Sequence, residues 1–271
     1  MKFKEIFYML GLKPNYKFFK TTKTFFGTFN GSRIYFYQWN TPKSSNEKLD
    51  PKELDELSSF LKQGDVAIDV GAHIGDTAMP ISLVCGVQGT VFAFEPNPVV
   101  FQILAKNSFI NSNNTNIVPI PFACSNNAQL EFNYDTPWLM NGGDKSYGKF
   151  FHGAAFKTFV NGVNGYELLK SKYPREIEKT KYIKIDVEGF DFLVLKQFEP
   201  LILDLKPYIK FEIAGFTSKE YRENLWEFFS GKSYDLRIVE NGKNFGRKAK
   251  REDFFNSSHF DVFCIPEKVK V

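Results

Sequence analysis

The chain has 271 residues, of which 43% are hydrophobic and 17% aromatic, and it carries a net charge of +4 at pH 7. This length and composition suit one large α/β domain with a sizeable core. No apolar run reaches 18 residues, which excludes a membrane-spanning helix. The three cysteines are scattered and form no C-x-x-C pair, which argues against a disulfide scaffold or a zinc site and favours a reducing, cytoplasmic location.

Residues 1–50 are predicted to form an N-terminal extension, and residues 51–271 the domain itself. Within the extension, residues 33–39 have the composition of a strand. Basic and aromatic side chains interleave before that strand, so this segment either makes peripheral contact with an anionic membrane or packs on the domain with a solvated outer face. The basic residues are Lys2, Lys4, Lys13, Lys17, Lys20, Lys23 and Arg33.

The domain is predicted to begin with a helix. Asp50 suits the N-cap and Pro51 the first helical position. Apolar residues then follow at helical spacing as far as Leu61. The chain next enters its most informative stretch, residues 65–75, with the sequence D-V-A-I-D-V-G-A-H-I-G.

Residues 66–75 predict a buried parallel strand, a glycine turn and the start of a helix that runs over 77–85. Gly71 lets the backbone turn sharply and approach a ligand without a Cβ in the way, and Gly75 lets the helix begin close over the strand. The next strand, 90–94, ends at Glu95, about 20 residues past the turn, where a carboxylate suits ribose hydroxyls. The pattern indicates a βαβ unit that binds an adenosine-type nucleoside.

The acidic residues around this turn favour S-adenosylmethionine over a dinucleotide. A dinucleotide site needs the middle glycine of G-x-G-x-x-G, and this chain has His73 there. Asp69 would repel a phosphate but attract the ammonium or sulfonium of S-adenosylmethionine. An NAD(P)-dependent sugar-nucleotide enzyme is the first alternative, although it needs a glycine where this chain has His73.

The following elements place further residues near the adenine. Asn97 is a good N-cap for a helix over 98–110, with Pro98 at its first position. A third strand, 117–120, precedes Ala123 and Ser125, and in a doubly wound sheet this position lies over the base of a bound nucleoside. A short strand is predicted over 129–134.

Residues 135–159 are rich in glycine and irregular, as in a lid, a binding loop or a disordered segment. The loop holds Trp138, which either stacks on a sugar or simply packs. It also holds His152, which either handles a proton or lies idle on the surface. A helix over 165–173 follows.

Three carboxylates mark the C-terminal half. The pattern predicts strands over 181–187, 207–213, 235–239 and 260–265, and helices over 190–198 and 218–230. Asp186, Glu188 and Glu212 lie at the carboxyl ends of the first two strands, where open α/β sheets bind ligands. Their mutual repulsion raises at least one pKa, which favours a general base or a bound divalent cation. Alternatively, one or two of them only cap helices or hold a turn. We predict no metal site.

Three motifs together resemble the FkbM family of S-adenosylmethionine-dependent methyltransferases. They are D-V-G-A-H-I-G at 69–75, F-E-P-N-P at 94–98 and I-K-I-D-V-E-G at 183–189, and F-E-I at 211–213 is also compatible. The resemblance covers about residues 60–215. It implies a Rossmann-like fold with seven strands, the last pair reversing direction, and O-methylation of a sugar or secondary metabolite. The family usually has asparagine where this chain has His73, which leaves open how this side chain contacts the cofactor.

The predicted fold is thus a mostly parallel seven-stranded sheet with helices on both faces. The predicted function is O-methylation of a small molecule or glycan, with no nucleic-acid partner. A nucleic-acid methyltransferase, suggested by a basic cluster over 243–251, and a non-enzymatic module are further alternatives. The predicted catalytic residues are Asp186, Glu188 and Glu212, and the predicted cofactor-binding residues are Asp69, Gly71, Ala72, His73, Gly75, Glu95, Asn97, Ala123, Ser125 and Asp186.

Overall fold

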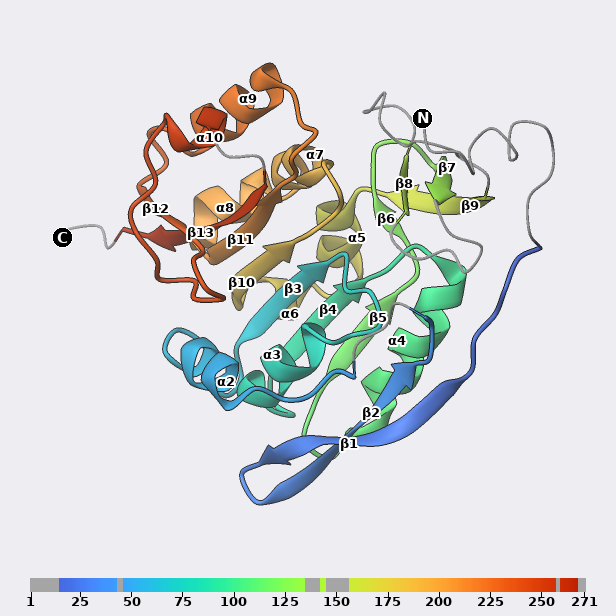
Figure 1. The fold of residues 1–271 in the computed structure, drawn as a ribbon. Coiled ribbons are helices and arrows are strands. Elements are labelled where there is room, and N and C mark those ends of the chain that lie inside the picture. Colours follow the sequence, from blue (N-terminus) through green and yellow to red (C-terminus); the bar gives the residue numbers. More distant parts are fainter. Residues whose placement is uncertain (1–14, 43–45, 135–141, 145–155, 257–258, 268–271) are drawn as a thin grey trace.

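A computed structural model describes residues 15–42, 46–134, 142–144, 156–256 and 259–267. Its centre is a seven-stranded sheet with the order β12-β13-β11-β10-β3-β4-β5 (Figure 1). All neighbouring strands are parallel except β13, which is antiparallel to both β11 and β12. The bounds are β3 Val66–Val70, β4 Thr90–Phe94, β5 Ile117–Ile120, β10 Thr180–Ile185, β11 Tyr208–Ile213, β12 Tyr234–Ile238 and β13 Phe260–Pro266.

The mostly parallel seven-stranded prediction is therefore confirmed, with one correction. The family resemblance implied that the last two strands both reverse direction, but only β13 does. Strand β13 is inserted between β11 and β12, so β12 again runs parallel to the rest of the sheet.

Helices cover both faces of the sheet, so its parallel strands are buried on both sides. In β3, alternate residues face opposite apolar clusters: Val66, Ile68 and Val70 belong to one, and Ala67 to the other. The Ala67 face is covered by α2 (Pro51–Ser58), α3 (Ala78–Cys85) and α4 (Pro98–Ile110). The opposite face is covered by α5 (Gly165–Lys172), α6 (Pro174–Ile177), α7 (Asp191–Gln197), α8 (Glu199–Leu205), α9 (Lys219–Phe229) and α10 (Asp253–Asn256).

The helix starts follow the predicted capping signals. The Asp50 side chain accepts a hydrogen bond from the Lys52 N–H, and the Asn97 side chain accepts from Val99. Pro51 and Pro98 stand at the first helical positions. No helix of the described residues is long and apolar enough to cross a membrane.

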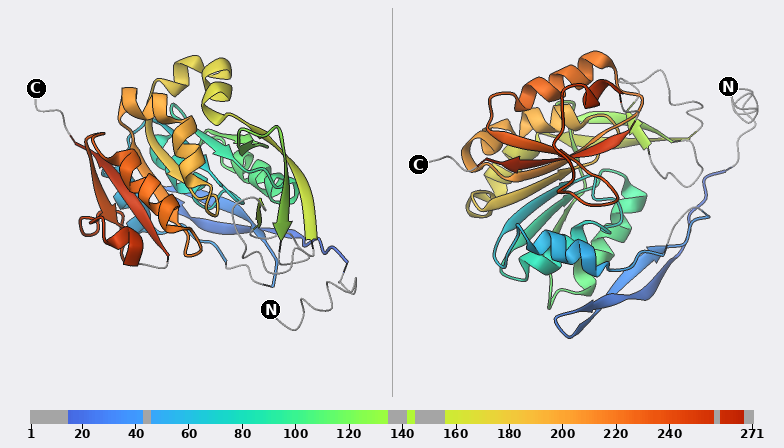
Figure 2. Two further views of the ribbon diagram at one scale, coloured as in Figure 1. Left: turned by 90° about the horizontal axis from the view of Figure 1, so that it is seen from above. Right: turned by 60° about the vertical axis from the view of Figure 1, so that its left-hand side comes forward.

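The N-terminal extension contributes a hairpin that runs along α4 (Figures 1 and 2). It consists of β1 (Thr21–Phe29), which the sequence did not predict, and β2 (Ser32–Trp39). Two asparagines of α4 and its C-cap hold β2 by hydrogen bonds. The Asn107 side chain hydrogen-bonds the backbone N–H and C=O of Tyr37, and the Asn111 side chain hydrogen-bonds those of Tyr35. The first fourteen residues, with Lys2, Lys4 and Lys13, lie outside the described residues.

A second, four-stranded sheet lies beside the carboxyl edge of the central sheet. Its order is β6-β9-β7-β8, with bounds β6 Ala123–Cys124, β7 Gln129–Tyr134, β8 Gly142–Asp144 and β9 Phe156–Val163. Two short parts of the predicted irregular loop, 142–144 and 156–159, are therefore strand. Trp138 and His152 lie outside the described residues.

Candidate active site

A cavity of about 280 Å³ lies at the carboxyl ends of β3, β4 and β10, roofed by side chains of β7. Its walls combine the turn after β3, the turn after β4, the segment after β5 and the turn after β10. The residues that line it are Val70, Gly71, His73, Asp76, Thr77, Phe94, Glu95, Pro96, Asn97, Val100, Phe122, Ala123, Cys124, Ser125, Leu130, Phe132, Tyr134, Lys184, Asp186, Val187, Glu188 and Phe190.

The glycine turn brings two strand ends together. Gly71 has φ of +86°, and a Cβ placed on it would stand 1.9 Å from the backbone oxygen of Asp186. Glycine is therefore required by the neighbouring strand end as well as by the turn. Gly75 has φ of +92°, and a Cβ there would meet Leu104 of α4 at 3.0 Å. Gly71 lines the cavity, whereas Ala72 and Gly75 only support the turn.

Glu95 lies at the cavity wall and is held by backbone donors. Its side chain accepts hydrogen bonds from the His73 N–H at 3.1 Å and from the Asn97 N–H at 2.8 Å. Burial raises the pKa of Glu95 to about 7, despite these two bonds and the nearby imidazole of His73. Each carboxylate oxygen keeps a lone pair for a ligand hydroxyl.

His73 takes a left-handed conformation, with φ of +49°. Asparagine adopts this conformation more readily than most residues, which is consistent with its usual presence there in the family that the motifs resemble. The imidazole Nδ1 lies 3.7 Å from Asp76 Oδ1. Burial opposes the charged ring, but the hydrogen bond and charge of Asp76 leave the His73 pKa raised. His73 Nε2 is buried and has no hydrogen-bond partner among the described residues.

Asp69 does not line the cavity. Its side chain is fully buried on the α3 side of the sheet, where Oδ2 accepts a hydrogen bond from the Thr77 hydroxyl at 2.6 Å. Asp69 Oδ1 has no hydrogen bond, but it lies 3.5 Å from Lys184 Nζ, an ion-pair distance. The structure therefore places a lysine that the sequence analysis passed over beside Asp69, and the contact between Asp69 and the cofactor's amino group stays a prediction.

The three predicted catalytic acids occupy different places. Asp186 and Glu188 line the cavity, whereas Glu212, on the neighbouring strand β11, does not. Asp186 Oδ2 lies 3.4 Å from Lys184 Nζ. Burial and then the charge of Asp186 raise the pKa of Glu188. Burial, Asp186 and Glu188 raise the pKa of Glu212 to about 8, so the predicted crowding of carboxylates is present.

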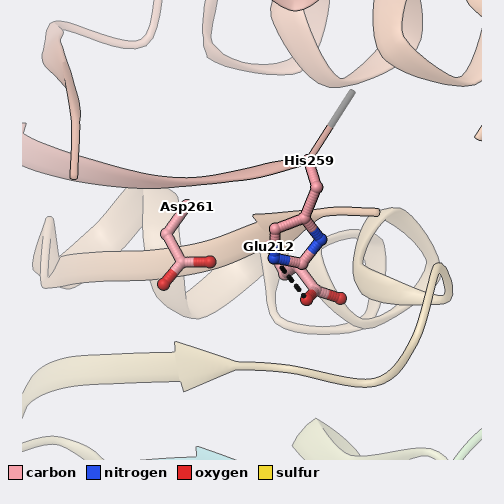
Figure 3. A group of neighbouring side chains, drawn as sticks. All are labelled: Glu212, His259 and Asp261. Atoms are coloured by element: carbon pink, nitrogen blue, oxygen red, sulfur yellow. Dashed lines mark ion pairs between the residues drawn. The ribbon is translucent and has the colours of Figure 1, made fainter. Parts of the chain in front are cut away.

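Glu212 also belongs to a group that could ligate a cation (Figure 3). The ligand atoms of Glu212, His259 and Asp261 lie within 4.8 Å of one another. However, His259 Nε2 already stands 3.5 Å from Glu212 Oε1, and Lys210 Nζ stands 3.2 Å from Asp261 Oδ2. The carboxylates of this group therefore have positively charged or protonatable partners within the protein.

Three residues were predicted to lie near the adenine, and the structure shows that they share one cavity. Asn97, Ala123 and Ser125 all line the cavity. The Asn97 side chain is occupied as the N-cap of α4, and the Ser125 hydroxyl accepts a hydrogen bond from the Asn127 N–H at 3.1 Å. These residues shape the wall of this end of the cavity.

The structure adds two residues that the sequence analysis missed, Lys184 and Tyr134. The Tyr134 hydroxyl is buried in the cavity wall and has no hydrogen-bond partner among the described residues. The alternation of polar and apolar residues over 129–134 predicted the strand. It could not show which side chains of that strand line the cavity. Lys184 lies inside the quoted I-K-I-D-V-E-G motif, two residues before Asp186. Its place in this motif was the one feature of the sequence that could have indicated a role in the site.

Comparison of this chain with known proteins identifies its family as one of methyltransferases. The family model described as "Methyltransferase FkbM domain" matches residues 69–238, more than half of the chain. The hexuronic acid methyltransferase AglP of Haloferax volcanii is 31% identical over 136 residues, which cover 50% of this chain and 50% of AglP. The chain thus spans about half the length of this curated relative.

Solved structures of low similarity include a methyltransferase and a protein with bound S-adenosyl-L-methionine. Methyltransferase FkbM from Methylobacillus flagellatus has a TM-score of 0.46 and 14% identity, covering 73% of this chain and 43% of that one. Aeropyrum pernix fibrillarin, solved with natively bound S-adenosyl-L-methionine, has a TM-score of 0.44 and 16% identity, covering 88% and 80%.

Proposed function

Because the chain belongs to the FkbM methyltransferase family, whose cofactor is S-adenosylmethionine, we propose that it methylates a hydroxyl of a sugar or related small molecule. The acceptor is either free or part of a glycan. The observation that carries the proposal is the position of Glu188, a cavity-lining carboxylate with a raised pKa at the carboxyl end of β10.

The cavity fits the cofactor in its polar chemistry. Two buried polar atoms of its wall, the Tyr134 hydroxyl and His73 Nε2, have no hydrogen-bond partner among the described residues. Buried polar groups are normally paired, so these atoms indicate a polar ligand. Four carboxylates line the same cavity and suit a ligand with positive charges: Asp76, Glu95, Asp186 and Glu188.

Different residues of the cavity would bind different parts of the cofactor. Glu95 would hold the ribose hydroxyls, and the segment Ala123–Ser125 with Asn97 would form the adenine wall. The turn at Gly71 would support the methionine part. When bound, S-adenosylmethionine supplies a methyl group already activated on a sulfonium, so the protein has to position the acceptor and accept its proton.

Among the three predicted acids, Glu188 is best placed to accept that proton. It lines the cavity, which Glu212 does not, and no ion pair occupies it among the described residues, whereas Asp186 has Lys184 beside it. Glu188 also has φ of +53°, a conformation that costs about 1–3 kcal/mol and is typical of functional positions. Its raised pKa makes it a stronger base than an exposed glutamate once it is ionised.

The charge of the site favours a hydroxyl over a carboxylate as the accepting group. AglP is named for a hexuronic acid, a sugar that offers both groups. In this chain the carboxyl edge already holds Asp186 and Glu188, with Glu212 nearby, and the pKa values of both glutamates are raised. An acceptor carboxylate would add a further negative charge to this group, which is unfavourable. We therefore expect an ether product, stable to mild base, rather than a base-labile methyl ester.

The test is methyl transfer to a panel of sugars and uronic acids by wild type, Glu188→Gln and Glu212→Gln. Glu188→Gln should lower kcat about 10²- to 10⁴-fold and leave the affinity for S-adenosylhomocysteine unchanged. Glu212→Gln is the matched control outside the cavity and should have a much smaller effect. Full turnover of Glu188→Gln would exclude the base, and a base-labile product would exclude the hydroxyl acceptor.

The pairing of the basic cluster over 243–251 speaks against the nucleic-acid alternative. Three of its five basic residues have acidic partners: Arg247 with Glu240 and Asp253, Lys248 with Asp235, and Arg251 with Glu223. Such pairing removes much of the positive field that phosphate binding requires. Peripheral membrane contact through the N-terminal segment stays a prediction, as does the cytoplasmic location.

A further inference from the structure

Lys184 is a buried lysine at the wall of the cavity. It stands on β10, one strand from the glycine turn, and only 10% of its side chain is exposed. Its Nζ lies 3.5 Å from Asp69 Oδ1 and 3.4 Å from Asp186 Oδ2. Lysine is among the residues least often buried without a partner, so this position needs an explanation beyond packing.

The pairing of β10 with β3 explains how Lys184 reaches the site. Lys184 and Asp69 are partners in the parallel register. Their immediate neighbours Ile183 and Ile185 face the opposite apolar cluster, so Lys184 points to the same side of the sheet as Asp69. Asp69 therefore holds the ammonium from within the protein, while the lysine itself lines the cavity.

The ion pairs keep Lys184 charged. Burial works against an ammonium, but the charges of Asp69 and then Asp186 outweigh it and raise the Lys184 pKa. Burial raises the pKa of Asp69, and the charge of Lys184 and a hydrogen bond from the Thr77 hydroxyl oppose that rise. A positive charge thus stands on β10, and strand β3 separates it from β4 and Glu95.

The cavity wall contains no other lysine or arginine among the described residues. Its second cationic candidate, His73, is paired with Asp76 and donates its backbone N–H to Glu95, on the ribose side. S-adenosylmethionine carries two positive groups, the sulfonium and the α-ammonium, and one negative group, the α-carboxylate. Several acids of the cavity wall would suit its positive groups, but among the described residues Lys184 is the one lysine or arginine that could pair with its carboxylate.

We propose that Lys184 binds the α-carboxylate of S-adenosylmethionine and that Asp69 is a positioning residue that aims the lysine. This rests on the cavity being the cofactor site. It revises the predicted role of Asp69, which acts on the cofactor through Lys184 instead of contacting its amino group. Asp186, on the other side of Lys184, remains available to the α-ammonium.

The test is a cycle that changes the lysine and the ligand separately. Affinities of wild type and Lys184→Met are measured by calorimetry for S-adenosylhomocysteine and for its decarboxylated analogue, which lacks only the carboxylate. Wild type should prefer the complete ligand by about 10- to 100-fold, the range of a charge-assisted hydrogen bond. Lys184→Met should bind both ligands nearly equally, and Lys184→Arg should keep the preference.

Two control variants keep the result interpretable. Glu95→Gln should weaken both ligands by the same factor, because the ribose is common to them. If Lys184→Met does not fold, the double variant Asp69→Asn/Lys184→Met removes both members of the buried pair and leaves no uncompensated charge there. The cycle is then completed with the double variant.

The proposal is overturned if wild type shows no preference for the carboxylate, or if the preference survives loss of the lysine. An equal loss of affinity for both ligands in Lys184→Met would assign the residue a structural role only and would also overturn it. These outcomes differ from failure of the proposed function. In that case wild type would either not bind S-adenosylhomocysteine at all, or bind it without methylating any sugar hydroxyl.

Discussion

The buried carboxyl of Glu95 should make cofactor binding depend on pH. Its pKa of about 7 in the free protein reflects burial, and a ribose hydroxyl is best held by the ionised form. At pH 8 about 90% of this group is ionised, and at pH 6 about 10%. If only the ionised form binds, the affinity for S-adenosylhomocysteine should fall about tenfold from pH 8 to pH 6.

The measurement is a calorimetric titration at half-unit steps between pH 5.5 and 8.5. Glu95→Gln should bind weakly at every pH and lose the dependence. His73 faces Glu95 and has a raised pKa, so His73→Asn serves as the control. Because asparagine tolerates the left-handed φ of +49°, this variant should fold and should keep most of the pH dependence. A flat wild-type profile, or a sloping one in Glu95→Gln, would refute the assignment.

Three further predictions concern other parts of the site. Tyr134→Phe removes an unpartnered buried hydroxyl and should weaken S-adenosylhomocysteine about 3- to 10-fold without lowering the melting temperature; unchanged affinity would exclude Tyr134 from the cofactor site. Gly71→Ala should cost at least about 3 kcal/mol in urea unfolding, because its Cβ would meet the Asp186 carbonyl; Gly31→Ala, with positive φ but open space, is the matched control and should cost about 1 kcal/mol. Treatment with EDTA should leave methyl transfer unchanged, since His259 and Lys210 already partner the carboxylates of Glu212 and Asp261; loss of activity restored by Mg²⁺ or Mn²⁺ would contradict this.

The sequence predicted those parts of the fold in which local pattern and tertiary structure agree. The apolar run of β3, the glycine turn and the Asn97–Pro98 helix start are each determined by neighbouring residues, and all appear where expected. Strand β1 was missed because exposed threonine, lysine and phenylalanine mix along it without alternation. Its partner β2 and the asparagines of α4 hold it in place instead.

The site was predicted less completely because its chemistry depends on contacts between distant segments. Asp69 follows an apolar run and precedes glycines, so the sequence placed it against the ligand. The structure instead shows Lys184, more than a hundred residues later, in register with it. A lysine between two isoleucines resembles an ordinary solvent-facing residue of a strand. Only the parallel pairing of β3 with β10 buries it beside an aspartate.

The same contacts give two nearby carboxylates different surroundings. Asp186 and Glu188 are two residues apart on one turn, and both line the cavity. Asp186 has the Lys184 ammonium 3.4 Å away, whereas Glu188 has no ion pair among the described residues. Glu188 is half-buried beside the charge of Asp186, so its affinity for a proton rises. In the proposed mechanism Asp186 and its partner Lys184 therefore belong to the cofactor side of the cavity, and Glu188 is the residue we expect to accept the proton.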